Sequence, residues 1–450
     1  MKIDVTLDYQ TILRNEARPV HLVAKLTAPK LETANRPRPV AFAVVLDRSG
    51  SMSGEPLELA KQACAGIIRN LRPDDLFSVV VFDGSAQVVI PLQKPVDRQE
   101  MADSIARISS GSSTNLMAGW LLGRDELLKA NQDCDKKILL LTDGHLNEGI
   151  IEPEKVEALT RSGFSKDAIR TSCLGFGDDY NEVALATMSS VGNGQLHDAD
   201  SPEKFPVILA DELDGLQKIT VQNVRLRVEP KLFCHVWMQF SDYPAIKLPD
   251  GRVEIAVGDL VSEEERYLVL LTEVLPLPLL PDGSLPASLE GEELLGLEFV
   301  WTEIGDTEVK ACTSTHLVRI RGTQDAGDVV LNQEVIAVIA NQIAAKATRE
   351  AADRARKGDF DGGLRSMTLA CSMIQGFAAA ELTAEASERL EKSQRTIGSR
   401  KLSARDLKDL VYESRYHART SSRTLYTGSR KGSKLGRKPS AQEQHQQPEQ

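Results

Sequence analysis

The chain has 450 residues, 41% of them hydrophobic, and a formal net charge of −11. This length exceeds what one hydrophobic core usually serves, so two or three domains are expected. The acidic balance argues against folded domains that coat nucleic acid or anionic membrane, and no apolar run approaches the roughly 18 to 20 residues of a spanning helix. Residues 1–5 lack the basic and apolar regions of a secretory signal, so we expect a cytoplasmic protein.

The first segment, residues 1–38, has the pattern of β-strands. Ile3, Val5 and Leu7 alternate with polar residues, and a second apolar stretch follows near residue 22. Two strands alone are only marginally stable. We therefore expect this segment to fold with a later β-rich part of the chain.

Residues 39–218 alternate short apolar runs with helical patterns, which predicts a Rossmann-like, doubly wound α/β domain. The apolar runs predict strands at 40–46, 76–82, 87–92, 137–141, 169–176 and 195–199. The helical patterns predict helices at 56–71, 98–108, 116–130, 153–160, 181–189 and 202–216. Residues 44–46 and 138–141 are continuously apolar, which is typical of central strands buried on both faces.

Residues 219–322 contain closely spaced alternating strands and predict an antiparallel β-sandwich with one solvated face. The α/β domain would then be an insertion between residues 1–38 and this segment. Residues 323–398 show helical spacing, as at Ile336, Ile339 and Ile343, and predict a helical hairpin region.

The last segment, residues 399–450, is expected to form a short helix and a disordered tail rich in basic residues and Gln. A basic cluster in the tail could bind an acidic partner, a membrane lipid or RNA, or could simply keep the tail soluble. It comprises Arg430, Lys431, Lys434, Arg437 and Lys438.

The six cysteines lie far apart, with no C-x-x-C pair and no His at zinc-finger spacing. This spacing argues against a structural zinc site. Several of them sit in apolar runs, so we expect reduced, mostly buried thiols.

Oxygen-bearing side chains follow two of the predicted central strands. Asp47, Ser49 and Ser51 leave the first strand, and Asp143 leaves a second. Ligands of open α/β sheets bind at the carboxyl ends of the strands, and a buried carboxylate needs compensation. With Thr114 from a small-residue loop, these residues form an all-oxygen set suited to Mg²⁺ or Mn²⁺ and less well to Ca²⁺.

Three segments around these residues resemble elements of von Willebrand factor type A domains. They are residues 47–52 (DRSGSM), 111–115 (GSSTN) and 141–144 (LTDG), which are similar in order and spacing to the family's D-x-S-x-S, Thr and T-D-G elements. The resemblance extends over residues 39–218. The wider chain is similar to bacterial proteins of this family that are related to inter-alpha-trypsin inhibitor heavy chains.

The resemblance implies a metal-ion-dependent adhesion site. Ser49 and Ser51 would bind the metal directly, Asp47 and Thr114 directly or through water, and Asp143 mainly through water. A Glu or Asp of a protein partner would complete the coordination. Such relatives are often secreted or lipid-anchored, but this sequence shows no signal for either, so we expect a role in an intracellular assembly or regulatory scaffold. Analogy with the family suggests an AAA-type ATPase as one partner.

Other interpretations of these residues remain open. Asp47 and Asp143 could each be ordinary helix-capping residues, and Asp83 most simply forms a turn. Arg48 and His145 are weak candidates for partner contacts. The rival function is a metal-dependent hydrolase that uses the cation as a Lewis acid, but the motif loops offer no obvious base apart from His145. A vestigial site in a structural protein is a third interpretation.

Overall fold

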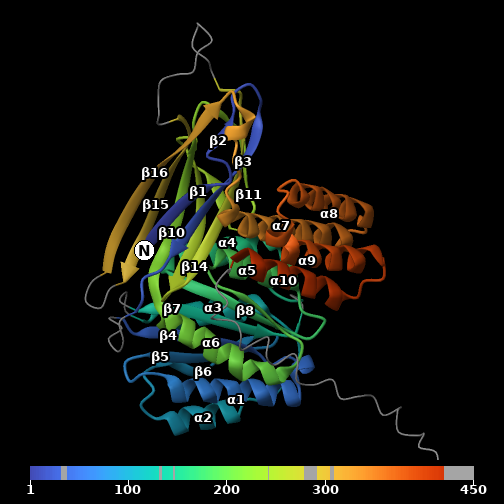
Figure 1. Cartoon of the computed structure of the whole chain (residues 1–450). Coiled ribbons are helices and arrows are strands. Elements are labelled where there is room, and N and C mark those ends of the chain that lie inside the picture. Colours follow the sequence, from blue (N-terminus) through green and yellow to red (C-terminus); the bar gives the residue numbers. More distant parts are fainter. Residues whose placement is uncertain are drawn as a thin grey trace, which may run out of the picture.

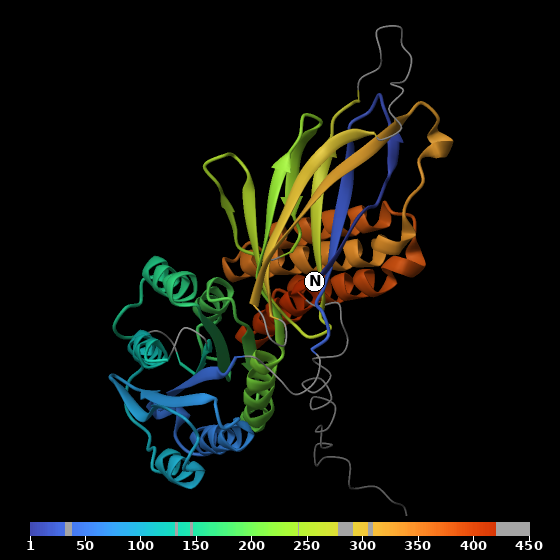
Figure 2. The same ribbon diagram turned by 90° about the vertical axis from the view of Figure 1, so that its left-hand side faces the viewer.

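The computed structural model describes residues 1–31, 38–130, 134–144, 147–241, 243–277, 291–304 and 309–419. Figure 1 shows three bodies: an α/β domain, a β-rich body above it and a helical bundle at the side. Figure 2, turned by 90°, shows the helical bundle packed along one side of the long strands. The chain therefore combines an α/β domain, a β-rich body and a helical bundle.

The α/β domain is built on a six-stranded sheet with the order β6-β5-β4-β7-β8-β9. Its strands are β4 (Val40–Asp47), β5 (Leu76–Phe82), β6 (Ala86–Gln93), β7 (Asp135–Thr142), β8 (Ile169–Phe176) and β9 (Leu196–Ala199). All neighbours are parallel except β6, which runs antiparallel to β5 at the edge. Every residue of β4 and β7 is buried, as the continuous apolar runs predict.

Helices cover both faces of this sheet. They are α1 (Glu55–Asn70), α2 (Arg98–Ala106), α3 (Leu116–Leu128), α4 (Pro153–Asp167), α5 (Glu182–Val191) and α6 (Phe205–Gln217). Successive side chains of a strand point to opposite faces, so Phe42 and Val44 alternate with Ala43 and Val45. The first pair packs with α1, α2 and α6, and the second pair packs with α3, α4 and α5.

One predicted helix ends too early. The sequence places the end of α4 near residue 160, whereas the helix continues to Asp167 and is closed by Ala168 in a left-handed conformation. Gly163 lies inside the added turns, where a Cβ atom would come 2.9 Å from the Trp120 ring. The glycine that weakens the helical pattern is thus needed for close packing of α4 against α3.

The β-rich body contains two sheets. The first has the order β1-β3-β14-β11, with β1 (Lys2–Leu7), β3 (Arg18–Thr27), β14 (Glu265–Val274) and β11 (Cys234–Gln239). The second has the order β12-β13-β10-β15-β16-β2, with β12 (Ala245–Lys247), β13 (Val253–Val261), β10 (Ile219–Pro230), β15 (Glu292–Ile304), β16 (Val309–Thr323) and β2 (Thr11–Leu13). A common core joins them and includes Leu22, Leu226, Leu270 and Phe299.

The N-terminal strands belong to this body, although the whole α/β domain separates them from its other strands in the sequence. Strand β3 pairs with β14 along its whole length, from Arg18 opposite Val274 to Thr27 opposite Glu265. One pair departs from the expected antiparallel arrangement, because β2 runs parallel to β16. These two strands are not joined by a hairpin, so no tight turn imposes an antiparallel direction.

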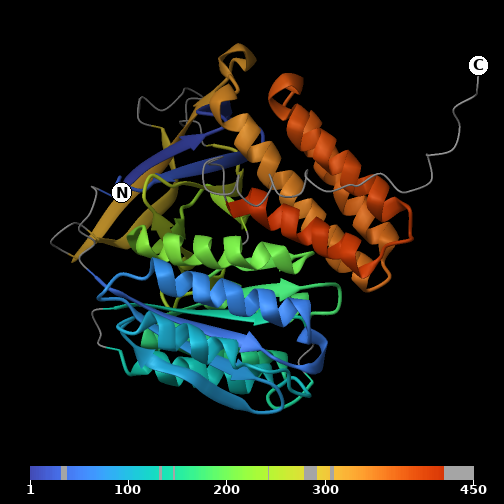
Figure 3. The same cartoon turned by 90° about the horizontal axis from the view of Figure 1, so that it is seen from below.

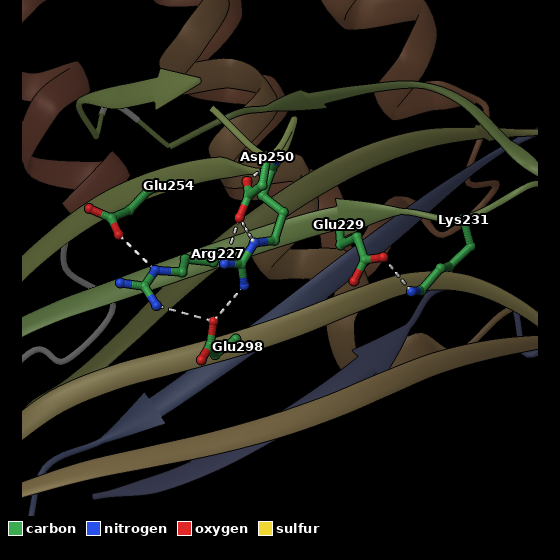
Figure 4. A network of polar contacts seen from close by, with 7 residues as sticks. Arg227, Glu229, Lys231, Asp250, Glu254 and Glu298 are labelled. Carbon is green, nitrogen blue, oxygen red and sulfur yellow. Dashed lines mark hydrogen bonds and ion pairs between the residues drawn. The ribbon is translucent and has the colours of Figure 1, made fainter. Parts of the chain in front are cut away.

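The solvent-facing side of the second sheet carries cross-strand ion pairs, drawn in Figure 4. Arg227 of β10 contacts Glu254 of β13 at 2.9 Å and Glu298 of β15 at 3.2 Å. Arg252 also contacts Glu298, at 2.8 Å, and contacts Asp250. Each carboxylate of this network therefore has a guanidinium partner.

The C-terminal region is helical, with α7 (Ile336–Arg356), α8 (Phe360–Gln375), α9 (Ala380–Gly398) and α10 (Ala404–Arg419). Ile336, Ile339 and Ile343 of α7 share a core with Val23 of β3 and Val269 of β14. Figure 3 shows α10 lying between the other helices of the bundle and the α/β domain. The predicted basic tail, including its Lys and Arg cluster, lies outside the described residues.

Charged side chains are buried where the α/β domain meets the β-rich body. Arg170 of β8 pairs with Asp259 of β13, and its guanidinium lies 3.7 Å from Asp135. A cavity of about 220 Å³ adjoins these residues and is also lined by Tyr243 and by Tyr412 of α10. Such pairs are costly to break by removing one partner, so they hold the two bodies in a defined orientation.

The cysteines and the helices agree with the sequence in two further respects. All six cysteines are free, and Cys64, Cys134, Cys173 and Cys234 are buried. Burial raises the pKa of the Cys64 and Cys173 thiols to about 12, so they remain protonated. No helix in the described part of the chain has the length and hydrophobicity that a membrane span requires.

Candidate metal-binding site

Two neighbouring parallel strands bring Asp47 and Asp143 to the same edge of the sheet. Leu46 of β4 lies opposite Leu141 of β7, so the residues that follow leave the sheet side by side. Asp47 is the last residue of β4 and is fully buried, and Asp143 comes directly after β7. This edge is where an open α/β sheet places its ligands.

The loop after β4 links these two carboxylates through hydroxyl groups. The backbone N–H of Ser49 donates to Asp47 Oδ1 at 2.8 Å, and Ser49 Oγ lies 3.1 Å from Ser51 Oγ. Ser51 Oγ donates to Asp143 Oδ1 at 2.8 Å. Hydrogen bonds therefore connect Asp47 to Asp143 through the backbone N–H of Ser49 and the hydroxyls of Ser49 and Ser51.

Thr114 reaches the same place from the loop before α3. The loop is held against the one after β4, because Gly111 N donates to Arg48 O at 2.6 Å and Gly50 N donates to Ser112 O at 3.2 Å. Thr114 is buried. A Cβ atom on Gly144 would lie 3.3 Å from Thr114 Oγ1 and 3.7 Å from Asp47 Oδ2. The five residues predicted as ligands are thus gathered at one point.

Burial raises the pKa values of the Asp47 and Asp143 carboxyl groups. Desolvation raises the pKa of Asp47, against hydrogen bonds from Thr142 and Ser49 that lower it. Desolvation also raises the pKa of Asp143 to about 6, and the negative charges of Asp47 and Asp179 add to this shift. Two acidic groups in such surroundings attract a positive charge.

The protein does not supply that charge from its own side chains in the described residues. Arg48 lies between Asp47 and Ser49 in the sequence, but its guanidinium pairs with Asp83 at 2.9 Å. Neither Asp47 nor Asp143 forms an ion pair with a described Lys or Arg. The unbalanced charge and the all-oxygen surroundings fit a hard divalent cation.

Carboxylates alone would not complete such a site. Across the described ranges, no group of three or more His, Cys, Asp or Glu side chains could hold a metal ion. A metal ion at this edge would therefore also need hydroxyl ligands, and Ser49, Ser51 and Thr114 are the hydroxyl residues beside the two carboxylates.

Two residues near the site, Asp83 and Thr142, make contacts that the sequence analysis did not predict. The predicted turn at Asp83 is present, with Ser85 N donating to Asp83 Oδ1 at 2.9 Å, but Asp83 also holds Arg48. Thr142 was not predicted as a site residue, yet its hydroxyl donates to Asp47 Oδ2 at 2.5 Å. Its position directly before Asp143 in the sequence could have indicated that it belongs to the site. His145 lies outside the described residues.

The fold and the oxygen-rich edge define a doubly wound α/β domain with ligand-bearing loops at its carboxyl edge. More particularly, residues 42–211 match the family model of the von Willebrand factor type A domain. The chain therefore contains a von Willebrand factor type A domain, and domains of this family generally mediate metal-dependent protein interactions.

Relatives of known sequence include bacterial and animal proteins. The chain is 29% identical to the uncharacterized protein sll0103 of Synechocystis sp., over 55% of this chain and 61% of that protein. It is 25% identical to the uncharacterized protein YfbK of Escherichia coli, over 57% and 47%. Human inter-alpha-trypsin inhibitor heavy chain H3 is 29% identical over 51% and 26%. The matches span less than two thirds of each relative's length.

Two solved structures share the fold over most of their length. One is a von Willebrand factor type A protein from Catenulispora acidiphila, with a TM-score of 0.68 and 19% identity over 92% of this chain and 96% of that one. The other is the ArnB paralog VWA2 from Sulfolobus acidocaldarius, with a TM-score of 0.59 and 14% identity over 93% and 98%. At these identities the likeness concerns the fold, including the bodies that flank the α/β domain.

Proposed function

We propose that this chain is a divalent-metal-dependent protein-binding module. Asp47, Ser49, Ser51, Thr114 and Asp143 would hold Mg²⁺ or Mn²⁺, and Ca²⁺ fits less well. The observation that carries this proposal is the buried pair of carboxylates that no described cation balances. A bound divalent ion would supply a positive centre with one position open to a carboxylate of a partner.

The residues at this edge of the sheet would have different roles in metal binding. Ser49 and Ser51 present hydroxyl oxygens, and Ser51 also orients Asp143 through its hydrogen bond. Thr142 keeps Asp47 in place by donating to one carboxylate oxygen. Arg48 stays engaged with Asp83, so a direct contact between Arg48 and a partner remains only a prediction. The same is true of His145.

The partner expected at this site is a protein that presents Glu or Asp. The setting that we propose is a cytoplasmic assembly or regulatory scaffold, and analogy with the family suggests an AAA-type ATPase as one of its members. We do not expect the folded domains to bind nucleic acid, because the chain carries a net charge of −11.

The alternative, a metal-dependent hydrolase, has less support. A hydrolase needs a group that can take a proton from water within hydrogen-bond reach of the reacting atom. The contacts of Asp47, Ser49, Ser51 and Asp143 in the described residues involve carboxyl, hydroxyl and backbone groups, with no His or Cys among them. We therefore propose that the chain is not an enzyme.

Affinity capture with the full chain tests the proposal. Proteins retained from lysate in millimolar Mg²⁺ should be released by EDTA and should not be retained by Asp47→Ala. Asp74→Ala is the matched control, because Asp74 lies in the same domain but is exposed and pairs only with Lys94. Partners that persist through both EDTA and Asp47→Ala would contradict a metal-dependent contact. Turnover by purified protein that is lost in Asp143→Ala would favour the hydrolase.

A further inference from the structure

The loop between β8 and α5, residues 177–181, flanks the candidate metal site. Thr142 of β7 lies opposite Gly175 of β8, so this loop leaves the sheet next to Asp143. The charge of Asp179 contributes to the raised pKa of Asp143, although the Asp179 side chain itself is exposed. The strand register thus places this loop at the border of the candidate metal site.

Tyr180 anchors the loop to the sheet. Its ring lies against Gly175, where a Cβ atom would come within 2.4 to 2.5 Å of ring carbons. Its hydroxyl donates to Asp198 Oδ1 of β9 at 2.7 Å. Burial raises the pKa of Tyr180, so the phenol remains a hydrogen-bond donor to the carboxylate.

Helix α10 holds the same loop from the other side. The ammonium of Lys408 lies 3.6 Å from the centre of the Tyr180 ring and donates to the carbonyl oxygen of Asp178 at 2.7 Å. Arg405, one turn earlier, forms two hydrogen bonds with the Asp198 carboxylate that accepts from Tyr180. Lys408 is buried, and cation–π contacts are stronger when the cation is desolvated.

The rest of the bundle is tied to these contacts. Leu410 and Val411 of α10 pack in the core that contains α7. Arg356 at the end of α7 pairs with Glu182, the first residue of α5 and thus the residue just beyond the loop. A shift of α10 or α7 would therefore be transmitted to residues 177–182.

We propose that Lys408 and Arg405 are positioning residues through which the helical bundle controls the metal site. They hold residues 177–181 at the edge where this loop leaves the sheet next to Asp143, and release of α10 would weaken metal binding. This inference rests on the proposed function, since it concerns the same site. It makes the α10 contact a route by which a partner of the bundle could regulate adhesion at the metal.

Calorimetric titration of the full chain with Mn²⁺ tests this coupling. Lys408→Met keeps the length of the side chain but removes the ammonium, and should lower Mn²⁺ affinity about fivefold or more, the lower end of measured couplings between sites. Lys408→Arg keeps a cation that can donate to the carbonyl and should restore part of that affinity. Lys2→Met is the matched control, because Lys2 is 73% exposed on β1 and pairs with Asp4, away from α10.

A double-mutant cycle separates positioning from a general loss of structure. Asp179→Asn should lower Mn²⁺ affinity by itself, and Lys408→Met should add little further loss in that background, because both act through the position of Asp179. Additive losses would overturn the proposed route. Tighter Mn²⁺ binding by Lys408→Met would also overturn it, because Lys408 would then act only as a repelling charge.

Hydrogen exchange provides a readout that does not depend on metal affinity. Amides of residues 177–182 should exchange faster in Lys408→Met, and in wild type Mn²⁺ should slow exchange in both this loop and residues 405–411, since coupling is reciprocal. Tyr180→Phe removes only the bond to Asp198 and serves if Lys408→Met does not fold. If the wild-type protein binds Mn²⁺ and the variants bind it with the same affinity, the positioning role alone is overturned. If the wild-type protein binds no Mn²⁺, the proposed function is overturned as well.

Discussion

Carboxylates occur in two contrasting settings in this molecule. On the outer face of the second β-sheet, Glu254 and Glu298 each contact an arginine (Figure 4). At the edge of the α/β sheet, Asp47 and Asp143 contact hydroxyls and backbone, and their pKa values are raised. The first setting is electrically complete within the chain. In the second, neither carboxylate pairs with a described Lys or Arg, and we propose that a bound cation supplies the balancing charge.

The largest effect that this contrast predicts is on metal binding. Asp47→Ala and Asp143→Ala should each lower Mn²⁺ affinity by more than about 100-fold, since even partners of metal ligands cost about 10- to 100-fold when mutated. Calorimetry of the purified full chain measures this. Affinity that stays within about tenfold of wild type in both variants would show that the two settings do not differ in the proposed way.

Neutralising one carboxylate should stabilise the metal-free protein. Asp143→Asn keeps an oxygen that can accept from Ser51 but removes the buried charge. In EDTA at pH 7.5, the free energy of unfolding should rise by about 1 to 2 kcal/mol, which discounts the full pKa shift for the part of the group that remains hydrated. Urea unfolding measures the change. Destabilisation by a similar amount would mean that the charge is compensated inside the protein.

Acid should weaken the metal site but not the outer network. The folded-state pKa of Asp143 is raised to about 6, and metal binding requires the ionised carboxylate. Mn²⁺ affinity should therefore fall about tenfold per pH unit below 6 as this group protonates. The free energy of unfolding of the metal-free protein should change in the opposite direction. Because the folded-state pKa of Asp143 is raised, its contribution to stability falls as the pH rises through 6. Calorimetric titration with Mn²⁺ and urea unfolding in EDTA, each at pH 7.5 and at pH 5, measure the two changes.

The smallest effect is expected on the outer face of the sheet. Glu229→Gln removes one charge of the pair with Lys231 on this face, where the Glu229 side chain is 53% exposed, so the free energy of unfolding should change by less than about 1 kcal/mol. Mn²⁺ affinity should not change, and the variant is a control for the two aspartates. A loss of several kcal/mol in urea unfolding would show that this network is more than a solvated surface.

Much of this organisation could be predicted from the sequence. The alternation of apolar runs and helical patterns predicts the α/β domain, and the strand ends point to Asp47, Ser49, Ser51 and Asp143, which hydrogen bonds connect at one edge of the sheet. Their role as metal ligands stays a prediction. These features are local, because a strand end and the loop after it are neighbours in sequence. Thr114 lies in a separate small-residue loop at the start of a predicted helix, which makes its hydroxyl a candidate ligand.

The contacts made by distant segments could not be predicted. Lys408 and Arg405 lie on an ordinary amphipathic helix, and nothing in their own segment indicates that they meet Tyr180 and Asp198. The length of α4 was missed for a related reason, because Gly163 weakens the helical pattern while the Trp120 ring requires it. In both places tertiary packing outweighs local preference.

The pairing of β3 with β14 has a consequence for synthesis of the chain. Strand β3 leaves the ribosome before the α/β domain, whereas its partner β14 follows that domain. At about 5 to 20 residues per second, the apolar face around Leu22 and Leu26 waits roughly ten seconds or more for its native neighbour. During that interval the α/β domain can fold as a unit, while the N-terminal strand is an open edge that chaperones must protect from aggregation.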